Sequence, residues 1–267
     1  MNYSIFCLDF QEFLHIFPKK CEKKEIWFSV LLLITEYKEK IGFFHRRKAK
    51  KGKLPPIITG GHIGPYPAAL LSLLGTPKNS LSYLAVYRER GDVLIADKEL
   101  SFLFPWQEEL CTEYARRLCV NLAVATLTEE EKSRRTQAVL IDKAGECVGV
   151  AAELLKVCNT VWVATGQSDW FAPCGEYTRT QYGNQPLFAS NPLPKADLVV
   201  APYGMEGWQY SGGKLFGPDG GVFPKKEEFF IPDYAHLPDF DPALVTAGVF
   251  AAFHPKELMT ALPSMTE

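Results

Sequence analysis

The chain has 267 residues, of which 47% are hydrophobic and 22% are charged, as in globular proteins and unlike disordered chains. The formal net charge of -2 and the pI near 6.2 give no reason to expect nucleic acid or an anionic membrane as a partner. We therefore expect a soluble protein whose length allows one large core or two smaller ones.

The first strongly apolar segment, residues 26–34, is too short to cross a membrane. It reads IWFSVLLLI, whereas a spanning helix needs roughly 20 apolar residues. Charged residues stand on both sides of it, so it does not have the form of a secretory signal. We expect this segment to be part of the core.

The seven cysteines predict free thiols. Their number is odd, no C-x-x-C pair occurs, and a chain of this length needs no disulfides for its stability. The five histidines never stand three or four residues apart, so the sequence has no local zinc motif. We expect a cytoplasmic protein without a metal centre.

A basic segment, RRKAKKGK at residues 46–53, precedes Pro55 and Pro56. Such a charge run before two prolines is typical of a solvated loop. The alternative is a contact with phosphate or nucleic acid.

The segment that follows predicts a strand, a glycine turn and a helix. Residues 57–59 (IIT) have strand composition, and TGGHIGP follows at 59–65. Pro67 suits the first turn of a helix and Gly75 suits its C-terminal end. Glycines between a strand and a helix could form an anion-binding nest, and the alternative is a structural turn with an incidental histidine. The contacts of the nest would come from Gly61, His62 and Gly64.

Residues 81–89 and 92–100 have the composition of two strands, with Arg90 and Gly91 between them, and they predict a hairpin. Residues 106–125 then predict a helix. Its apolar face would be formed by residues at a spacing of four, namely Leu110, Tyr114, Leu118 and Leu122. The charged residues 126–136 predict the end of this helix and an exposed connection, where we place a domain boundary.

Residues 137–165 have the clearest pattern in the chain. Short apolar runs at 138–141 and 160–164 flank the helical segment CVGVAAELLKVC, and this order predicts a parallel strand–helix–strand unit. The run at 196–202, ADLVVAP, could extend the same sheet. Further on, residues 214–224 predict a glycine-rich hairpin, and residues 245–253 predict a C-terminal helix that Pro255 interrupts.

Through VLIDKAGECVGVAAELLKVCNTVWVAT this unit resembles the Rossmann superfamily of dinucleotide-binding folds. The resemblance covers about thirty residues. It implies that the amides opening the helix face the phosphates of NAD or NADP, with contacts from Gly145, Gly149 and Thr165. The chain departs from the G-x-G-x-x-G fingerprint, since only G-x-x-x-G remains and Glu146 would repel phosphate. The acidic residue that holds the ribose of NAD is replaced by Thr165, Gly166 and Gln167.

Other residues near this unit have two interpretations each. Cys147 could be a reactive thiol at a helix start or a buried structural cysteine. Asp142 and Lys143 stand at a strand end where catalytic groups often lie, or they form a local ion pair. The aromatic residues between the strands could line a ligand pocket or form the core of their own loop; they are Trp170, Phe171, Tyr177, Tyr182 and Phe188.

The predicted fold is α/β, with a Rossmann-like parallel sheet in the C-terminal half and a smaller N-terminal α/β region that contains a hairpin. The predicted domains are residues 1–136 and residues 137–267. The predicted function is the binding of a nucleotide or a small phosphorylated or acidic metabolite in an interdomain cleft, with NAD(P)-dependent oxidoreduction as the leading enzymatic hypothesis. The alternative is a non-enzymatic Rossmann-shaped binding or regulatory protein without a cofactor. Neither nucleic acid nor a membrane is expected as a partner, and no catalytic residue or oligomeric state is predicted.

Overall fold

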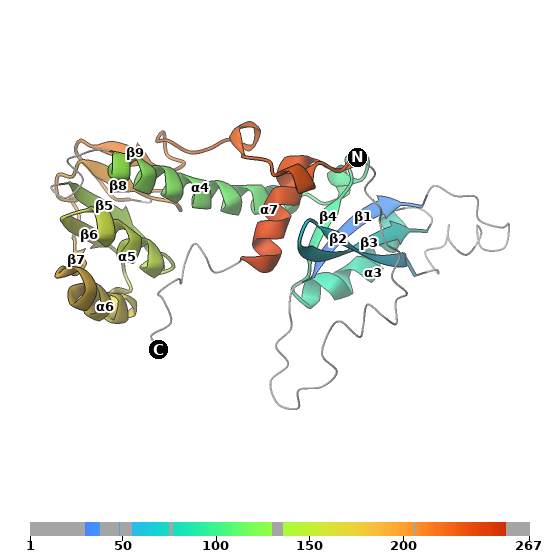
Figure 1. Cartoon of the computed structure of the whole chain (residues 1–267), viewed down its shortest axis with the longest axis horizontal. Helices are drawn as coiled ribbons and strands as arrows, with labels where there is room; N and C mark the ends of the chain where they lie inside the picture. The colour runs from blue at the N-terminus through green and yellow to red at the C-terminus, as the bar shows by residue number, and fades with distance from the viewer. Residues whose placement is uncertain are drawn as a thin grey trace, which may run out of the picture. The chain divides into compact units, whose positions relative to one another are not determined.

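The computed structural model describes residues 30–37, 48, 55–74, 77–129, 136–205 and 207–254 (Figure 1). The chain is a mixed α/β protein with two sheets, and it divides into two compact units. Unit 1 comprises residues 1–112 and 230–254, and unit 2 comprises residues 113–229 and 255–267. Within the described ranges, no helix has both the length and the apolar character that a membrane span requires.

Several sequence-based predictions lie wholly or partly on residues outside this description. They concern residues 26–29 of the first apolar segment, the basic loop at 46–53, of which only Lys48 is described, residues 130–135 of the charged connection, and the interruption of the last helix at Pro255. The domain boundary predicted at residue 136 follows helix α4 and coincides with neither division between the units. It stays a prediction.

Unit 1 is built on a four-stranded sheet with the order β2-β3-β1-β4. Strand β1 pairs in parallel with β3 and β4, and β2 pairs antiparallel with β3. The elements of this unit are β1 (Leu31–Glu36), β2 (Ile57–Ile63), β3 (Tyr66–Leu73), α3 (Pro77–Glu89), β4 (Val93–Ala96), η1 (Ser101–Leu103), η5 (Asp233–Ala235) and α7 (Pro242–Phe253).

Side chains are buried on both faces of this sheet, and for that reason its central strands β1 and β3 are mainly apolar. Leu32 and Ile34 point to one face, where they join a core cluster with Leu84 of α3 and with Phe104. The other face carries Leu31 and packs against α7. The predicted C-terminal helix is confirmed, and Asp241 caps it by accepting hydrogen bonds from the amides of Ala243 and Leu244.

The helix predicted after Pro67 is wrong, because residues 66–73 form strand β3. Gly64, with a φ of 58°, makes the tight turn of a β2–β3 hairpin, and β1 pairs with the other edge of β3. Pairing on both sides outweighs the helix propensity of the alanines and leucines in this segment. The hairpin is therefore present in the N-terminal region, but at residues 57–73.

The hairpin predicted for residues 81–100 is also wrong, since residues 77–89 form helix α3. Leu84 is buried and Tyr87 is partly buried one helical turn later, whereas Val86 between them is 56% exposed. A spacing of three is that of a helix and not of a strand, in which Val86 would share a face with Leu84. The strand after Gly91 is confirmed as β4.

Helix α4 (Gln107–Glu129) is confirmed, but its buried face is displaced by one residue from the predicted one. The side chains that it buries include Cys111, Ala115, Cys119, Ala123 and Leu127. Leu122, predicted to be in the core, is 44% exposed. Most of these side chains are small and stand four residues apart, which allows close packing. The predicted face was instead based on large apolar residues.

Unit 2 contains a five-stranded parallel sheet with the order β7-β6-β5-β8-β9. Numbered within the unit, this order is 3-2-1-4-5, which is the order of the Rossmann fold. The elements after α4 are β5 (Gln137–Ile141), α5 (Val148–Val157), β6 (Thr160–Ala164), η3 (Ser168–Phe171), α6 (Ala172–Tyr182), β7 (Leu187–Phe188), β8 (Leu198–Val200), β9 (Lys214–Phe216) and η4 (Lys226–Glu228). The predicted strand–helix–strand unit and the added strand β8 are confirmed.

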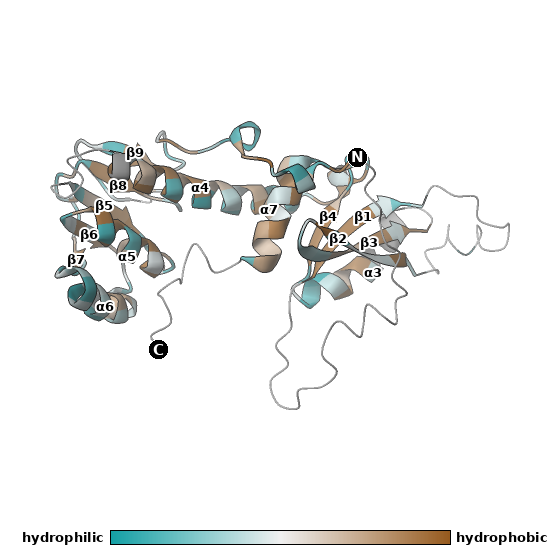
Figure 2. Cartoon of the chain, in the orientation of Figure 1, coloured by the Kyte–Doolittle hydropathy of each residue, from teal (hydrophilic) through white to brown (hydrophobic). Residues whose placement is uncertain are grey.

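This sheet is covered partly by helix α5 and partly by the loops after β7 and β8. Strands β5 and β6 are mainly apolar (brown in Figure 2), and α5 packs on both of them, whereas α6 is mainly polar. Val139, Ile141 and Val199 belong to a second core cluster, to which the loops after β7 and β8 contribute Leu193 and Trp208. The loop after β8 is thus part of the core.

The turn predicted at residues 218–221 is present, and Val222 closes it through a 2.9 Å hydrogen bond from its amide to the carbonyl of Leu215. The ladder of β9, however, is formed with β8, to which it is parallel. The chain around the turn extends the sheet rather than standing apart as an isolated hairpin.

We expect Gly248→Val to lower the free energy of unfolding by about 1–3 kcal/mol, as overpacked core sites do. A Cβ atom at Gly248 would overlap the Cδ1 atom of Ile95 on the sheet. Adding Ile95→Ala should recover part of the loss, and Ala251→Val on the same helix is the matched control. Urea unfolding measures all of these variants, and equal losses for Gly248→Val and the control would contradict this account of the packing.

Candidate functional site

A cavity of about 430 Å³ opens at the carboxyl ends of β5 and β8. After β5, the chain adds β6 and then β7 on one side of that strand. It then returns to add β8 on the other side of β5, so the strand order reverses between β5 and β8. Ligands of open α/β sheets bind in the crevice at such a switch point. The lining residues all belong to unit 2 and are Ile141, Asp142, Lys143, Ala144, Glu146, Tyr203, Gly204 and Trp208.

The first wall of this crevice is the turn between β5 and α5, and the Asp142 side chain organises it. Asp142 is 1% exposed. Its Oδ1 accepts hydrogen bonds from the amides of Gly145 at 3.0 Å and Glu146 at 2.9 Å, and its Oδ2 accepts one from Cys147 at 2.7 Å. Gly145 and Glu146 belong to the turn before α5, and Cys147 is the N-cap of that helix. The carboxylate of Asp142 therefore takes the place that an anionic ligand would occupy in a phosphate-binding turn.

Burial and hydrogen bonding act on this carboxyl group in opposite directions. Burial raises the pKa of Asp142, the hydrogen bonds from Cys147, Glu146 and Gly145 oppose that rise, and the charge of Glu146 adds to it. Cys147, predicted as either reactive or structural, is buried, and burial raises the pKa of its thiol well above the ordinary value. The structural interpretation of Cys147 is the one that fits, because nucleophilic attack requires the thiolate.

Gly145 has a φ of 79°, a conformation that favours glycine, and two side chains cover it. A Cβ atom at this position would lie 2.8 Å from the Trp170 ring and 3.0 Å from Cβ of Gln167. The space in which a pyrophosphate would approach Gly145 is thus bordered by Trp170 and Gln167 from the loop after β6. The role of this glycine in the structure is to allow that close packing.

The two other residues predicted to contact a cofactor beside this turn, Gly149 and Thr165, differ in their surroundings. Gly149 is buried in the first turn of α5. Thr165 follows β6, and its Oγ1 accepts a hydrogen bond from the Gln167 amide at 3.0 Å. The next residue, Gly166, donates to the carbonyl of Lys143 at 3.4 Å, which ties the loop after β6 to the loop after β5.

The second wall comes from the loop after β8 and carries Tyr203, Gly204 and Trp208. Two polar side chains fix this loop. Asp219 accepts a hydrogen bond from the Met205 amide, and Asn191 both donates to the carbonyl of Gly207 at 3.0 Å and accepts from the Gln209 amide at 3.1 Å. The two aromatic side chains are therefore held on a loop with a defined backbone.

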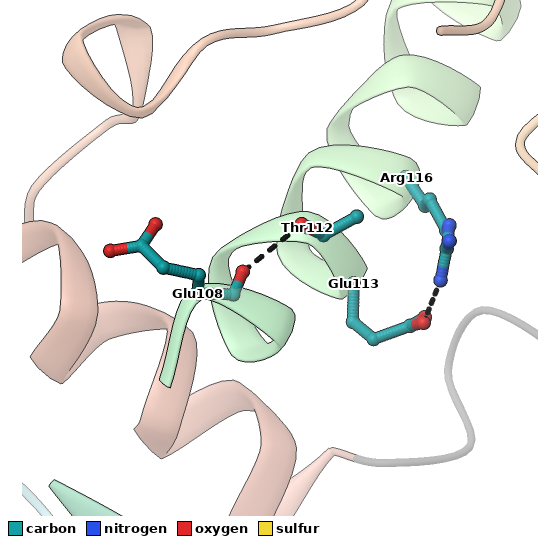
Figure 3. A network of polar contacts seen from close by, with 4 residues as sticks. All are labelled: Glu108, Thr112, Glu113 and Arg116. Carbon is teal, nitrogen blue, oxygen red and sulfur yellow. Dashed lines mark hydrogen bonds and ion pairs between the residues drawn. The ribbon is translucent and has the colours of Figure 1, made fainter. Parts of the chain in front are cut away.

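Tyr203 connects the two walls. Its side chain lines the cavity together with Glu146 of the first wall, and the guanidinium of Arg116 lies 4.4 Å from the centre of its ring, within cation–π distance. Arg116 is also ion-paired with Glu113, one turn earlier on α4 (Figure 3). The residue before Glu113, Thr112, donates a hydrogen bond from its hydroxyl to the Glu108 carbonyl at 3.0 Å. Burial raises the pKa of the Tyr203 hydroxyl, and Cys147 and Glu146 raise it further.

The second predicted site, in the segment TGGHIGP, depended on a helix after the glycine turn, and the structure has a strand there. Gly61 and His62 lie within strand β2, opposite Ala68 and Pro67 of β3, and no helix follows the turn at Gly64. The ring of Tyr234 packs over Gly64, where a Cβ atom would lie 2.8 Å from Cγ of the ring. A strand hairpin offers no helix amides to an anion, so the predicted nest is corrected to a structural turn. Gly61, His62 and Gly64 belong to unit 1, and the crevice lies in unit 2.

The other reactive and aromatic side chains of the described residues are best explained by structural roles. The cysteines among them, Cys111, Cys119, Cys147, Cys158 and Cys174, are free and buried. In that part of the chain no group of histidine, cysteine or carboxylate side chains is arranged to hold a metal ion. Phe171 packs edge-on against Phe188, and Tyr177 against Tyr182, so four of the five aromatic residues predicted as a pocket or a loop core contact one another.

Sequence reasoning missed the second wall of the crevice. Tyr203, Gly204 and Trp208 directly follow the predicted strand 196–202, and in a parallel sheet its carboxyl end meets that of β5. This position was the signal that could have identified them. Using this signal requires the order of the strands, because only residues that follow a neighbour of β5 can complete the crevice.

No protein-family model matches the chain, and no curated protein matches it. Among solved structures it is similar to L-tryptophan dehydrogenase from Nostoc punctiforme, with 9% identity, a TM-score of 0.30, and coverage of 87% of this chain and 76% of that one. It is also similar to a chorismate mutase/shikimate 5-dehydrogenase fusion protein from Clostridium acetobutylicum, with 15% identity, a TM-score of 0.23, and coverage of 75% and 73%. Similarities this weak do not identify a function.

We expect Asp142→Ala to lower the free energy of unfolding by roughly 2–4 kcal/mol, because it leaves three amides without their acceptor. Asp142→Asn should lose less, since its remaining oxygen can still serve Gly145 and Glu146. Urea unfolding gives the comparison. Asp169→Ala, which removes an exposed carboxylate in the same unit, is the control and should change stability by less than about 0.5 kcal/mol. An equally small effect of Asp142→Ala would show that its hydrogen bonds do not hold the turn.

Proposed function

We propose that unit 2 binds a nucleoside-containing small molecule in the crevice at the carboxyl ends of β5 and β8. The observation that carries this proposal is the position of the cavity at the switch point of a parallel sheet with the order 3-2-1-4-5. The crevice offers aromatic surface on Tyr203 and Trp208 for a base or sugar, and polar groups on Lys143 and Glu146 for orientation.

The β5–α5 turn does not fit the pyrophosphate of a dinucleotide in the position expected from the Rossmann superfamily. A phosphate there would have to displace the Asp142 carboxylate from the three amides that it holds. It would also meet the Glu146 carboxylate at the same edge of the cavity. The geometry therefore supports nucleoside binding better than NAD(P)-dependent oxidoreduction, and it assigns no catalytic residue.

The alternative of a Rossmann-shaped protein without a cofactor shares this fold and differs in one respect, which is whether the crevice binds a ligand at all. Asp142 is compatible with both proposals. The cavity itself favours a ligand, because the loop after β8 is fixed by Asp219 and Asn191 and leaves the crevice open.

Thermal unfolding of the full chain in the presence of NAD, NADP, ATP and S-adenosylmethionine tests the proposal. We expect at least one of these adenosine compounds to raise the midpoint temperature by several degrees, as a ligand at 100 times its Kd stabilises by about 2.7 kcal/mol. Ala144→Trp, which fills the crevice from an exposed position, should abolish the shift. Ala85→Trp on α3, also at an exposed position, should leave it unchanged. No shift with any of the four compounds would contradict nucleoside binding and leave the cofactor-free alternative.

A further inference from the structure

The crevice differs from a phosphate-binding turn in the sign of the charge that it presents. Two carboxylates, those of Asp142 and Glu146, line it together with a single ammonium group, that of Lys143. The amides of the β5–α5 turn, those of Gly145, Glu146 and Cys147, are donors to Asp142. An anionic group placed at the β5–α5 turn would thus face carboxylates without the hydrogen bonds that these three amides give to Asp142.

Glu146 is the acid that can act on a ligand. Its side chain is exposed and lines the cavity, whereas Asp142 is buried and held by backbone amides. Glu146 lines the crevice together with Tyr203 of the loop after β8, and, besides burial, its charge raises the pKa of the Tyr203 hydroxyl. The other cation near Tyr203, Arg116, approaches the Tyr203 ring from α4 and is ion-paired with Glu113.

Aromatic rings complete an environment suited to positive charge. Tyr203 and Trp208 line the same cavity as Glu146, and cations bind well where an aromatic face and a carboxylate lie together. A tryptophan ring is the strongest cation–π partner among the side chains.

We infer that the ligand of this crevice carries a cationic group, an ammonium or a sulfonium, at the place where a dinucleotide carries its pyrophosphate. This inference rests on the proposed function, since it specifies the charge of the nucleoside-type ligand. Asp142 is then the residue that excludes phosphate from the β5–α5 turn, because its carboxylate already holds the amides of Gly145, Glu146 and Cys147. Glu146 is the residue that selects the cation.

Three compounds with one nucleoside and different 5′ groups test the inference: 5′-amino-5′-deoxyadenosine, adenosine and AMP. Calorimetric titration of the full chain at low ionic strength gives their Kd values. We expect the amine to bind at least about tenfold more tightly than AMP, with adenosine between them, and we expect this preference to weaken as salt is added.

Glu146→Gln should reduce the preference for the amine over adenosine several-fold, because it removes the charge but keeps the size of the side chain. Glu153→Gln, on helix α5 and outside the lining of the crevice, should leave the preference unchanged. AMP binding as tightly as the amine, or a preference unaffected by Glu146→Gln, overturns the inference while the proposed function stands. If none of the three compounds binds, the proposed function and the inference both fail.

Discussion

The carboxylate of Asp142 holds the turn on which the whole interpretation of unit 2 depends. Asp142 directly follows strand β5, and its buried carboxylate accepts hydrogen bonds from the amides of Gly145, Glu146 and Cys147, so it holds the turn that leads into helix α5. A buried carboxylate is costly unless hydrogen bonds compensate it, and unpaired helix amides are costly unless an acceptor reaches them. Each group satisfies the other, and together they fix the backbone where the crevice begins.

This constraint separates the fold from the function that usually accompanies it. Unit 2 has the strand order of the Rossmann fold and a cavity at its switch point, yet the amides of its β5–α5 turn are bonded to Asp142. Shared architecture therefore predicts the place of the ligand, while the side chains around it determine the kind of ligand. Asp142, Glu146 and the aromatic residues of the β8 loop are those side chains here.

The accuracy of the sequence-based predictions follows the range of the interactions involved. The strand–helix–strand pattern of residues 137–164 was predicted correctly because its signals are local: short apolar runs and a helix between them. Residues 66–73 were predicted as a helix because alanine, leucine and an initial proline favour one, and pairing with β1 and β2 decides otherwise. Residues 81–89 have strand composition, and the burial of Leu84 and Tyr87 on one helical face decides the reverse. For α4, the sequence predicted the helix but not which of its sides is buried.

By itself the sequence determined the α/β class, the parallel unit around β5 and α5, the free cysteines of the described residues, and the departure of residues 142–149 from the dinucleotide fingerprint. These depend on residue type and near neighbours, which the sequence displays directly. Tertiary structure alone decided that β8 lies beside β5, that Tyr203 and Trp208 face Asp142 and Glu146 across one cavity, and that the TGGHIGP segment is a hairpin. The physical reason is that strand pairing and side-chain burial join residues far apart in the chain, and no local pattern specifies which partners will meet.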